Sequence, residues 1–597
     1  MRHFTLLALT CATYGQTQNN QATTRYQPTT AEVAAIGEKA AKLKAVLPPP
    51  TSPLYADVAV YHKAAEWILR YPEEFFTKAY VPQANAVLDR GLARAAEAKS
   101  GNPSWTKAKG RLSRGYVSKV DGSLQPYAML IPASYDPAKP ARLDVVLHGR
   151  GATLNEVSFL ASHDSDKPVP GDQLQLEVYG RANNAYRWAG EADVFEALAA
   201  VRKLYNIDPD RIVLRGFSMG GAGVWHIGLH YPSMWAAIEA GAGFTETLKY
   251  AKVTAPPDYQ RAAMHIYDAA DYAPNVSNVP TVGYGGEIDP QLQGSVNIKE
   301  ALAAEGLTGL RALFLVGPQT AHKFHPDSKK ESDAFIDAAL PRKKPTDFRF
   351  VTFTPRYGES FGVKIVAMER QYERSEFTVR GDAITTKNVA RLELADAKAV
   401  SIDDQRLRGR VFERVDGKWK TGASKGLRKV AGLQGPVDDA FLDSFLCVKP
   451  AGGSHPRLTT FAADFAKWMR GDVPVKDAAS VSAADIASSN LVLFGDPASN
   501  ALIAKVAPKL PVKWTADAIE LGGKSFDAKS HTLVMIYPNP LNPARYVVLN
   551  SGHTMGQKEF MGTNALLYPR LGDYAVIETA TGTVKLAGLF DESWRVR

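Results

Sequence analysis

The stretch Arg211-Ile-Val-Leu-Arg-Gly-Phe-Ser-Met-Gly-Gly221 is the segment of this chain that says most about its fold. It runs from an apolar segment into a glycine-flanked serine, Ser218, and helix-forming residues continue to about His230. Gly216 and Gly220 permit a strained turn, because a side chain at either position would collide with the neighbouring strand or helix. The pattern predicts a strand, a tight turn that exposes the Ser218 hydroxyl, and a helix; a buried structural serine is the alternative.

Segments before this turn indicate a parallel sheet. Val194, Leu198 and Val201 repeat at helical spacing, and the turn Asn206-Ile-Asp-Pro-Asp210 separates them from the strand. Parallel strands need long connections, which are usually helical, so the order helix, strand, turn, helix predicts an α/β fold. A serine raised above the end of such a strand is suited to nucleophilic attack.

An acidic residue that could assist Ser218 follows the next predicted strand. Val279-Pro-Thr-Val-Gly-Tyr-Gly285 leads into a loop that carries Asp289. A carboxylate there can fix the tautomer of a histidine and stabilise its charged form. Asp289 is the predicted acid. Glu287 lies two residues earlier and could point the same way, and a turn-forming aspartate before proline is the structural alternative.

A histidine follows the strand after that. Arg311-Ala-Leu-Phe-Leu-Val316 exits through a loop that carries His322 and His325. His325 precedes a proline, which restricts its backbone to extended conformations, whereas His322 lies where the loop can fold back over the sheet edge. His322 is the predicted general base, which takes the Ser218 proton and passes it to the leaving group.

Two backbone N–H groups are needed to stabilise the oxyanion that nucleophilic attack creates. One is expected from Met219, directly after the serine. The other is expected from the loop His148-Gly-Arg-Gly151, which follows the predicted strand Leu143–Leu147. Either Arg150 or Gly151 can supply it.

The stretch Tyr179–Glu191 combines aromatic rings, amides and guanidinium groups, which suit a polar or aromatic substrate. The predicted substrate-binding residues are Arg181, Asn183, Tyr186 and Trp188. The alternative is that these side chains brace a long loop against the helix that begins near Glu191.

Four motifs carry a resemblance to a known group of proteins: Asp121-Gly-Ser-Leu-Gln-Pro-Tyr127, His148-Gly149, Gly216-Phe-Ser-Met-Gly-Gly-Ala-Gly-Val-Trp225 and Gly286-Glu-Ile-Asp289. Together they make the segment from about residue 115 to 340 resemble α/β-hydrolases of the prolyl-oligopeptidase-like and carbohydrate-esterase-like bacterial group. The resemblance implies a Ser-His-Asp hydrolase of esters or peptides, with Ser218, Asp289 and His322 in those roles. No seven- or eight-fold propeller repeat precedes the segment, which favours an esterase over a peptidase.

Composition and periodicity divide the chain into several regions. Its 597 residues are 45% hydrophobic and 22% charged, which is typical of a folded protein with more than one domain. The predicted regions are a signal peptide (1–18), an N-terminal helical region (30–104), an α/β-hydrolase catalytic domain (105–342), a small β-sandwich (346–425) and a smaller C-terminal α/β domain (430–597). The helical region is either a brace or a cap over the site. The β-sandwich is either a spacer or a carbohydrate-binding module.

The first residues predict export. A charged start, Met1-Arg-His3, precedes the apolar segment Phe4–Leu9 and small residues to about Gly15, as in a short signal peptide. The alternative is a frayed cytoplasmic N-terminus. We expect the protein to be secreted or periplasmic. With the leader removed, Cys447 would be alone and could form no intramolecular disulfide.

Charge and hydropathy argue against several other classes of function. The net charge of +9 comes from 71 basic and 62 acidic side chains spread along the chain, so nucleic-acid binding is not expected. No segment after the leader has the roughly 18 consecutive apolar residues of a membrane span. No cofactor or metal is expected, because His226-Ile-Gly-Leu-His230 lacks the glutamate of a zinc-protease helix and paired cysteines are absent.

The sequence therefore predicts an exported serine esterase that forms an acyl-enzyme on Ser218 and acts on small-molecule or polysaccharide-linked esters, including aromatic acyl esters. A serine peptidase with the same triad is one alternative. A non-catalytic cell-surface binding protein on a hydrolase scaffold is another, because one scaffold hosts many functions. The oligomeric state is not predicted.

Overall fold

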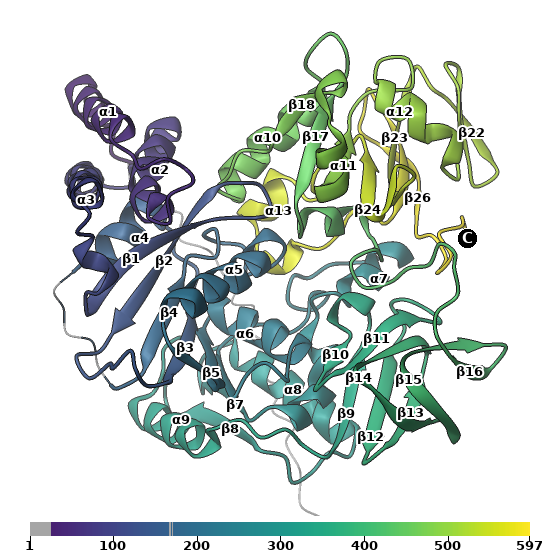
Figure 1. The fold of residues 1–597 in the computed structure, drawn as a ribbon, viewed down its shortest axis with the longest axis horizontal. Helices are drawn as coiled ribbons and strands as arrows, with labels where there is room; N and C mark the ends of the chain where they lie inside the picture. The colour runs from purple at the N-terminus through teal and green to yellow at the C-terminus, as the bar shows by residue number, and fades with distance from the viewer. Residues whose placement is uncertain (1–24, 166, 168, 170) are drawn as a thin grey trace, which may run out of the picture.

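The computed structural model describes residues 25–165, 167, 169 and 171–597. Figure 1 shows a central α/β domain in contact with an N-terminal helical unit, a curved β unit and a C-terminal α/β unit. The predicted signal peptide lies outside the described residues. None of the helices described combines the length and the apolar character that crossing a membrane requires.

The N-terminal unit consists of three helices. They are α1 (Thr30–Ala45), α2 (Tyr55–Arg70) and α3 (Tyr80–Ser100). A capping box begins α1, in which Thr29 and Glu32 each accept from the other's backbone N–H. The apolar faces of the helices share one core with Val157 and Leu160 of α4 (Glu156–His163), a helix of the central domain. The helical unit is thus packed against the side of that domain.

The central domain is built on an eight-stranded sheet with the order β1-β2-β4-β3-β5-β6-β7-β8. Its strands are β1 (Gly110–Val117), β2 (Leu124–Ile131), β3 (Ala141–Leu147), β4 (Leu174–Val178), β5 (Ile207–Phe217), β6 (Ala237–Gly241), β7 (Thr281–Gly286) and β8 (Ala312–Gly317). The pairs β1–β2 and β2–β4 are antiparallel, and every pair from β4 to β8 is parallel. The α/β class and the four strands predicted around the candidate site are confirmed.

Helices connect the parallel strands. They are α4, α5 (Ala189–Leu204), α6 (Met219–His230), α7 (Asp258–Met264) with the 3-10 helix η3 (Ala269–Asn278) before β7, and α8 (Leu292–Ala304), while α9 (Pro326–Ala339) follows β8. Every residue of α6 is buried, because β3, β5 and β6 lie on one side of it and η3 on another. Trp225, His226 and His230 are therefore core side chains.

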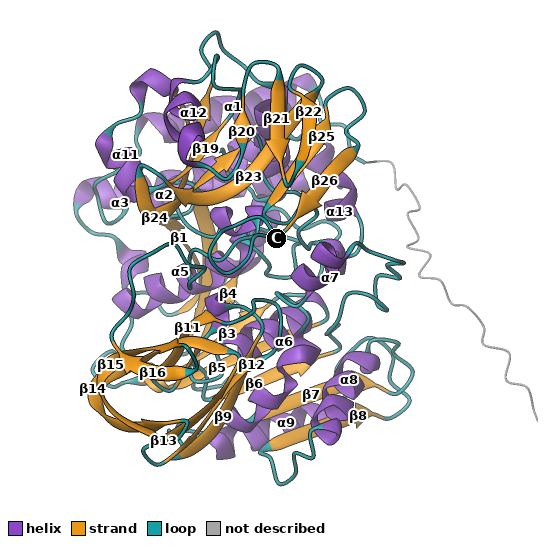
Figure 2. Cartoon of the chain, turned by 90° about the vertical axis from the view of Figure 1, so that its right-hand side faces the viewer, coloured by secondary structure: helices purple, strands orange, loops and turns teal. Residues whose placement is uncertain are grey.

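The β unit follows the central domain. Its strands are β9 (Asp347–Thr352), β10 (Glu359–Ser360), β11 (Val363–Met368), β12 (Ser375–Arg380), β13 (Ala383–Lys387), β14 (Val389–Ile402), β15 (Gln405–Val415) and β16 (Lys418–Thr421). They form one hydrogen-bonded sheet, and Figure 2 shows it curving around its own apolar core. The sheet is continuous because the first half of β14 pairs with β11 and its end pairs with β13. β14 thus runs without interruption through the apolar segments 392–394 and 400–402.

The C-terminal unit holds a seven-stranded sheet with the order β18-β17-β19-β24-β23-β25-β26. These strands are β17 (Phe445–Lys449), β18 (Val475–Asp477), β19 (Asn490–Leu493), β23 (His531–Asn539), β24 (Asn542–Leu549), β25 (Tyr574–Glu578) and β26 (Val584–Gly588). A small sheet adds β20 (Lys513–Trp514), β21 (Ala518–Leu521) and β22 (Lys524–Asp527). The α-helices are α10 (Pro456–Trp468), α11 (Ala483–Ser488), α12 (Ala501–Val506) and α13 (Gln557–Met561), and the 3-10 helices are η5 (Val437–Phe441), η6 (Ala478–Ser480), η7 (Ala507–Lys509) and η8 (Asn564–Leu566). The first four strands of the order are parallel, which agrees with the predicted second α/β layer.

A buried charge cluster joins three of these units. Glu156 of α4 accepts from Lys63 of α2 at 2.7 Å and from Nε of Arg470 of the C-terminal unit at 3.0 Å. Arg470 also donates to both carboxylate oxygens of Glu74, at 2.8 and 3.0 Å. All four side chains are more than nine-tenths buried. Burial by itself raises the pKa of Glu156, but the Arg470 and Lys63 cations outweigh it and hold the pKa well below its ordinary value.

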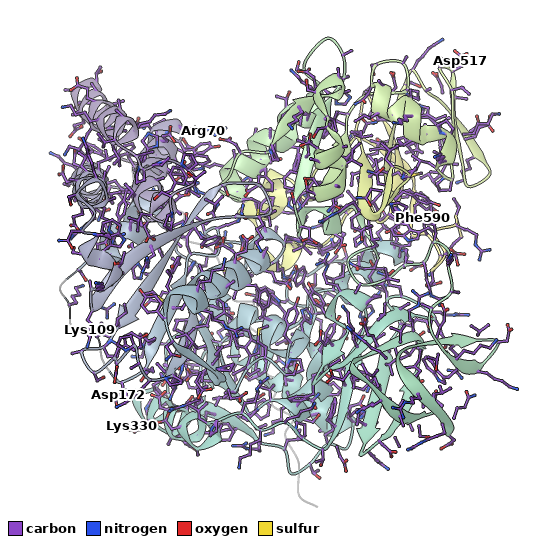
Figure 3. All side chains as sticks on the ribbon, viewed as in Figure 1. Arg70, Lys109, Asp172, Lys330, Asp517 and Phe590 are labelled. Carbon is purple, nitrogen blue, oxygen red and sulfur yellow. The ribbon has the colours of Figure 1, made fainter. Side chains whose placement is uncertain are left out.

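Weaker contacts surround this cluster. Trp67 of α2 donates through Nε1 to the backbone oxygen of Ala466 at 3.2 Å. Arg70, labelled in Figure 3 at the edge of the helical unit, pairs with the exposed Asp472 at 2.7 Å. Such exposed pairs contribute little to stability, so the buried cluster carries the electrostatic part of this contact.

Candidate active site

The turn predicted around Ser218 lies between β5 and α6, at the carboxyl edge of the parallel strands. Ser218 has backbone angles of φ 60° and ψ −121°, a conformation that residues other than glycine rarely adopt. A Cβ atom on Gly216 would lie 2.4 Å from the Gly220 oxygen, and one on Gly220 would lie 2.0 Å from the Leu147 oxygen. Both glycines are therefore required, because any side chain would displace backbone.

The structure brings Ser218, His322 and Asp289 into one hydrogen-bonded chain. His322 lies 2.8 Å from the Ser218 Oγ through Nε2 and 2.7 Å from Asp289 Oδ2 through Nδ1. Asp289 is 2% exposed and accepts a further bond from the Gln291 N–H at 3.0 Å, so its carboxylate is held in place. This arrangement fixes the tautomer in which Nδ1–H donates to Asp289 and Nε2 accepts from the Ser218 hydroxyl.

The two alternative residues have other contacts. Glu287 accepts from the backbone N–H and the side-chain amide of Gln319, at 2.7 and 3.0 Å, and thereby anchors the loop that carries the histidine. His325 is the residue before α9, and its backbone N–H donates to the Tyr284 hydroxyl at 2.8 Å. Neither side chain reaches Ser218 in the described structure.

Hydrogen bonds in the oxyanion loop show whether the N–H of Arg150 or that of Gly151 is available to an oxyanion. The Gly151 N–H donates to Asn183 Oδ1 at 3.0 Å, and Asn183 Nδ2 donates back to the Gly151 oxygen at 2.8 Å. The Gly151 N–H is thus occupied, and its prediction as an oxyanion donor is wrong. Among the described residues, the N–H groups of Arg150 and Met219 have no protein acceptor, so they are the pair available to an oxyanion.

The C-terminal unit holds this loop from the other side. The Arg150 guanidinium donates to the Gly562 oxygen at 2.7 Å and to the Met561 oxygen at 3.4 Å. Asn564 Nδ2 donates to the Asn183 oxygen at 2.9 Å. In Figure 1 the helix α13, just before these residues, lies between the C-terminal unit and the central domain. A segment more than 300 residues from the oxyanion loop therefore braces it.

The same segment forms one wall of a cavity over the serine. The cavity has a volume of about 600 Å³ and is lined by Arg150, Ser218, Met219, Phe244, Tyr250, Gln291, Met561, Gly562, Thr563 and Asn564. The rings of Phe244 and Tyr250 stack with centroids 4.7 Å apart. Sequence reasoning missed this aromatic pair and the C-terminal wall, because neither forms a motif with the serine. No residue of the N-terminal helices lines the cavity, which favours their role as a brace.

Three of the four predicted substrate-binding residues are buried and do not line the cavity. Arg181 is fully buried and bonded to Asp121 and the Met469 oxygen, at 2.7 and 2.9 Å. Tyr186 is buried and donates to the His148 oxygen at 3.1 Å. Their assignment to substrate is wrong, because the C-terminal unit and the oxyanion loop cover them.

Trp188 and Asn183 also bind other parts of the protein. Trp188 is 1% exposed and donates through Nε1 to the Leu567 oxygen at 3.1 Å, so it anchors the C-terminal segment. Asn183 is half-buried, and both polar atoms of its side-chain amide are hydrogen-bonded to the Gly151 backbone. The alternative interpretation, that this stretch braces a long loop, describes all four residues.

With a mostly parallel eight-stranded sheet and a hydrogen-bonded serine, histidine and aspartate at its carboxyl edge, the chain is a serine hydrolase with an α/β-hydrolase domain. Within that class, residues 179–337 match the Prolyl oligopeptidase family, and they include Ser218, Asp289 and His322. No curated protein matches the sequence. Within the described residues, no group of three or more His, Cys, Asp or Glu side chains is arranged to hold a metal ion.

Several solved structures are similar to part of the chain. A CE1 ferulic acid esterase from Anaeromyces mucronatus is 18% identical, with 39% of this chain and 90% of that chain covered and a TM-score of 0.29. A puromycin-hydrolysing peptidase from Mycobacterium tuberculosis is 18% identical, with 39% and 40% covered and a TM-score of 0.30. An S-formylglutathione hydrolase from Agrobacterium tumefaciens is 17% identical, with 40% and 97% covered and a TM-score of 0.29. At these identities the similarities assign no substrate.

Proposed function

We propose that this protein hydrolyses carboxylic esters through an acyl-enzyme on Ser218, with His322 as general base and acid and Asp289 as the residue that orients it. The hydrogen-bonded chain of these three side chains at the wall of a cavity is the observation that supports the proposal. The fixed geometry means that no side chain has to move before attack.

The proposed reaction has two steps. The Ser218 Oγ attacks the carbonyl carbon while its proton passes to His322 Nε2, and the N–H groups of Met219 and Arg150 stabilise the oxyanion. The tetrahedral intermediate collapses as His322 gives that proton to the leaving alkoxide, which leaves an acyl group on Ser218. Water then attacks the acyl-enzyme by the same route, with His322 again as base, and releases the acid. Asp289 stabilises the imidazolium in both steps.

The cavity lining favours an ester with an aromatic or apolar acyl group. Phe244, Tyr250, Met219 and Met561 offer a ring-stacking and apolar surface next to the serine. Arg150 is the charged residue of the lining, and no carboxylate side chain belongs to it within the described residues. The lining therefore has no group to neutralise the ammonium of a peptide N-terminus, whereas a neutral ester needs none.

A peptidase with the same three residues is the second candidate. The observation in its favour is that the matching family takes its name from an oligopeptidase. An amide leaving group makes greater demands on His322, because the departing nitrogen must be protonated as the bond breaks.

Labelling and turnover experiments test the proposal together. We expect a fluorophosphonate probe to label the wild-type protein at Ser218, and the protein to release p-nitrophenol from short and aromatic acyl esters faster than p-nitroaniline from peptide anilides. Labelling with turnover of anilides alone would select the peptidase. If the protein is not labelled and turns over neither kind of substrate, the hypothesis of a non-catalytic binding protein on a hydrolase scaffold would remain.

Asn183→Ala should weaken catalysis without removing a reacting group. It deletes both bonds to Gly151, so the neighbouring Arg150 N–H loses its fixed direction toward the oxyanion. We expect kcat to fall by about 10- to 100-fold with a smaller change in KM, because the oxyanion forms only after substrate is bound. Steady-state kinetics with an aromatic p-nitrophenyl ester measure both constants.

Two further variants make that experiment specific. Asn183→Asp keeps the acceptor for the Gly151 N–H and should recover part of kcat. Asn102→Ala removes an exposed amide at the end of α3 and should leave kcat unchanged. An unchanged kcat in Asn183→Ala would show that Asn183 is not a positioning residue.

A further inference from the structure

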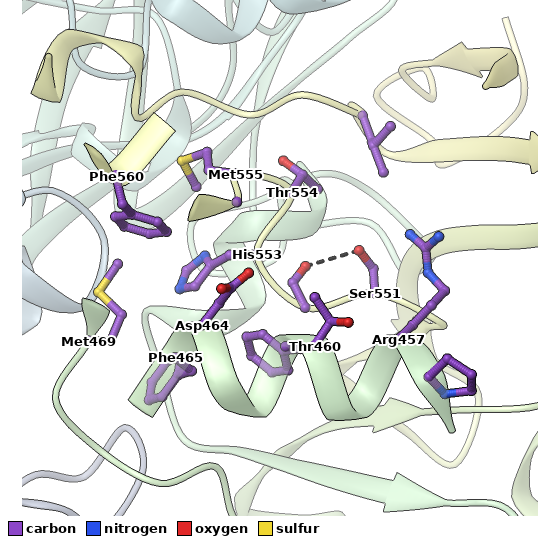
Figure 4. A pocket seen from close by; sticks show the side chains of 15 residues that line it. Arg457, Thr460, Asp464, Phe465, Met469, Ser551, His553, Thr554, Met555 and Phe560 are labelled. Carbon is purple, nitrogen blue, oxygen red and sulfur yellow. Dashed lines mark hydrogen bonds between the residues drawn. The ribbon is translucent and has the colours of Figure 1, made fainter. Parts of the chain in front are cut away.

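A second cavity lies wholly within the C-terminal unit. Its volume is about 340 Å³, within the range of roughly 300–1,000 Å³ typical of small-molecule sites. It runs along one face of α10, opposite the loop from Ser551 to Gly556 and the helix α13, as Figure 4 shows from close by. None of its lining residues also lines the Ser218 cavity.

The position of this cavity follows from the order of the strands. β17 leads into α10, and β24 leads into the loop that begins at Asn550, so the carboxyl ends of two parallel strands supply the lining. β18 lies on one side of β17 and β19 on the other, so the strand order reverses there. In open α/β sheets, ligands bind outside the carboxyl ends of strands near such a reversal.

Two opposite charges on α10, those of Arg457 and Asp464, lack ion-pair partners in the described structure. Arg457 donates through Nε to the Asn550 oxygen at 2.7 Å, but no carboxylate lies within ion-pair distance of its guanidinium. Asp464 has neither a hydrogen-bond donor nor a cation within bonding distance. Burial lowers the pKa of Arg457 and raises the pKa of Asp464, because each charge is partly removed from water without compensation.

A buried histidine adds an unsatisfied acceptor. The His553 side chain is 4% exposed, and its Nδ1 lies 3.4 Å from Asp438. With the Nδ1 proton directed at Asp438, Nε2 is the acceptor, and it has no hydrogen-bond partner. Leaving such a group unpaired costs free energy, and His553 is one of the residues that line the cavity.

The remaining lining is apolar. It consists of Phe461, Phe465, Met469, Met555, Phe560 and Leu571. Most of these side chains lie toward the Asp464 end of α10, whereas Thr460 and Ser551 lie toward the Arg457 end. The cavity is therefore polar with a cation at one end and apolar with an anion at the other.

We propose that this cavity binds a small zwitterionic ligand of dipeptide size, with its carboxylate on Arg457, its ammonium on Asp464 and an apolar side chain beside that ammonium. Arg457 and Asp464 are seven residues apart, so they share a face of α10 and are separated by about 10 Å along its axis. An extended dipeptide covers about 7 Å, and the length of the arginine side chain covers the rest.

Calorimetric titration of the full-length Ser218→Ala protein with the dipeptide Phe-Ala tests this site without turnover. We expect Phe-Ala to bind, and N-acetyl-Phe-Ala and Phe-Ala amide each to bind at least tenfold more weakly, because each lacks one terminal charge. The reversed dipeptide, Ala-Phe, should also bind more weakly, because its ring would lie toward the polar end.

Single substitutions assign the two charges. Arg457→Met should remove the difference between Phe-Ala and its amide, and Asp464→Asn should remove the difference between Phe-Ala and its acetylated form. Lys505→Met, on the exposed face of α12, should leave all affinities unchanged. The proposal is overturned if the three Phe-Ala forms bind alike, if none binds at millimolar concentration, or if Arg457→Met and Asp464→Asn both leave the affinities unchanged.

Discussion

Ser218→Ala is expected to lower kcat for ester hydrolysis by about 10⁴- to 10⁶-fold while the protein stays folded. The substitution deletes the oxygen that attacks the carbonyl carbon and leaves a side chain that fits the same turn. Initial rates with a chromogenic aromatic ester measure the loss, and far-ultraviolet circular dichroism checks the fold. Fluorophosphonate labelling should disappear with the activity.

Combining substitutions sharpens this prediction. Asp289→Asn should cost roughly 10³- to 10⁴-fold, because an amide can direct its N–H toward His322 Nδ1 and reverse the tautomer. Adding His322→Gln to Ser218→Ala should cost almost nothing more, because the residues act as one unit. Ser277→Ala, at an exposed position of the same domain where the hydroxyl donates to the Pro274 oxygen, should leave kcat unchanged. Full ester turnover by Ser218→Ala would refute the assignment of the nucleophile.

Glu156→Gln is expected to lower the free energy of unfolding by about 3–5 kcal/mol at pH 7. The change keeps the shape of the side chain but leaves Lys63 and one side of Arg470 buried without a counter-charge. Because the cluster joins the helical, central and C-terminal units, the first thermal transition should move to lower temperature. Denaturant and thermal unfolding followed by tryptophan fluorescence measure the effect.

The pH dependence of this difference has a defined sign. The pKa of Glu156 lies below its ordinary value in the folded protein, so its stabilisation is complete at neutral pH and is lost as the pH falls below the ordinary value of 4.5. Wild type and Glu156→Gln should therefore converge in acid. Glu73→Gln breaks an exposed pair with Lys467 and should cost about 0–1 kcal/mol at any pH. Equal effects of the two substitutions at pH 7 would contradict the role of the buried cluster.

Much of the candidate site could be predicted because it depends on short stretches of sequence and on the order of the strands. A Cβ atom on Gly216 or Gly220 would lie within 2.4 Å of a backbone atom. Glycine is therefore required at both positions, and the turn can be recognised from a few neighbouring residues. The carboxyl ends of parallel strands share one edge, so Asp289 and His322 could be located by counting strands after Ser218. Their contact at 2.7 Å follows from that topology.

The oxyanion loop shows where such reasoning stops. Arg150 and Gly151 are adjacent and equally able to offer an N–H, and nothing local distinguishes them. The choice depends on Asn183, whose side chain occupies the Gly151 N–H from a loop about 30 residues later. Arg181 and Trp188 were misassigned for a related reason: whether a polar or aromatic side chain contacts substrate or lies in an interface depends on what covers it.

Steric limits on the backbone and the alternation of strand and helix act over a few residues, so the strands around the site, the strained turn and the order of serine, acid and histidine could be predicted from residue types. Which N–H faces the oxyanion, which rings line the cavity and which units meet at Glu156 became clear from the packed structure alone. Those outcomes depend on burial and on hydrogen bonds between segments hundreds of residues apart, such as Arg150 and Gly562. Burial and hydrogen bonds between distant segments contribute to stability only when the whole chain is packed.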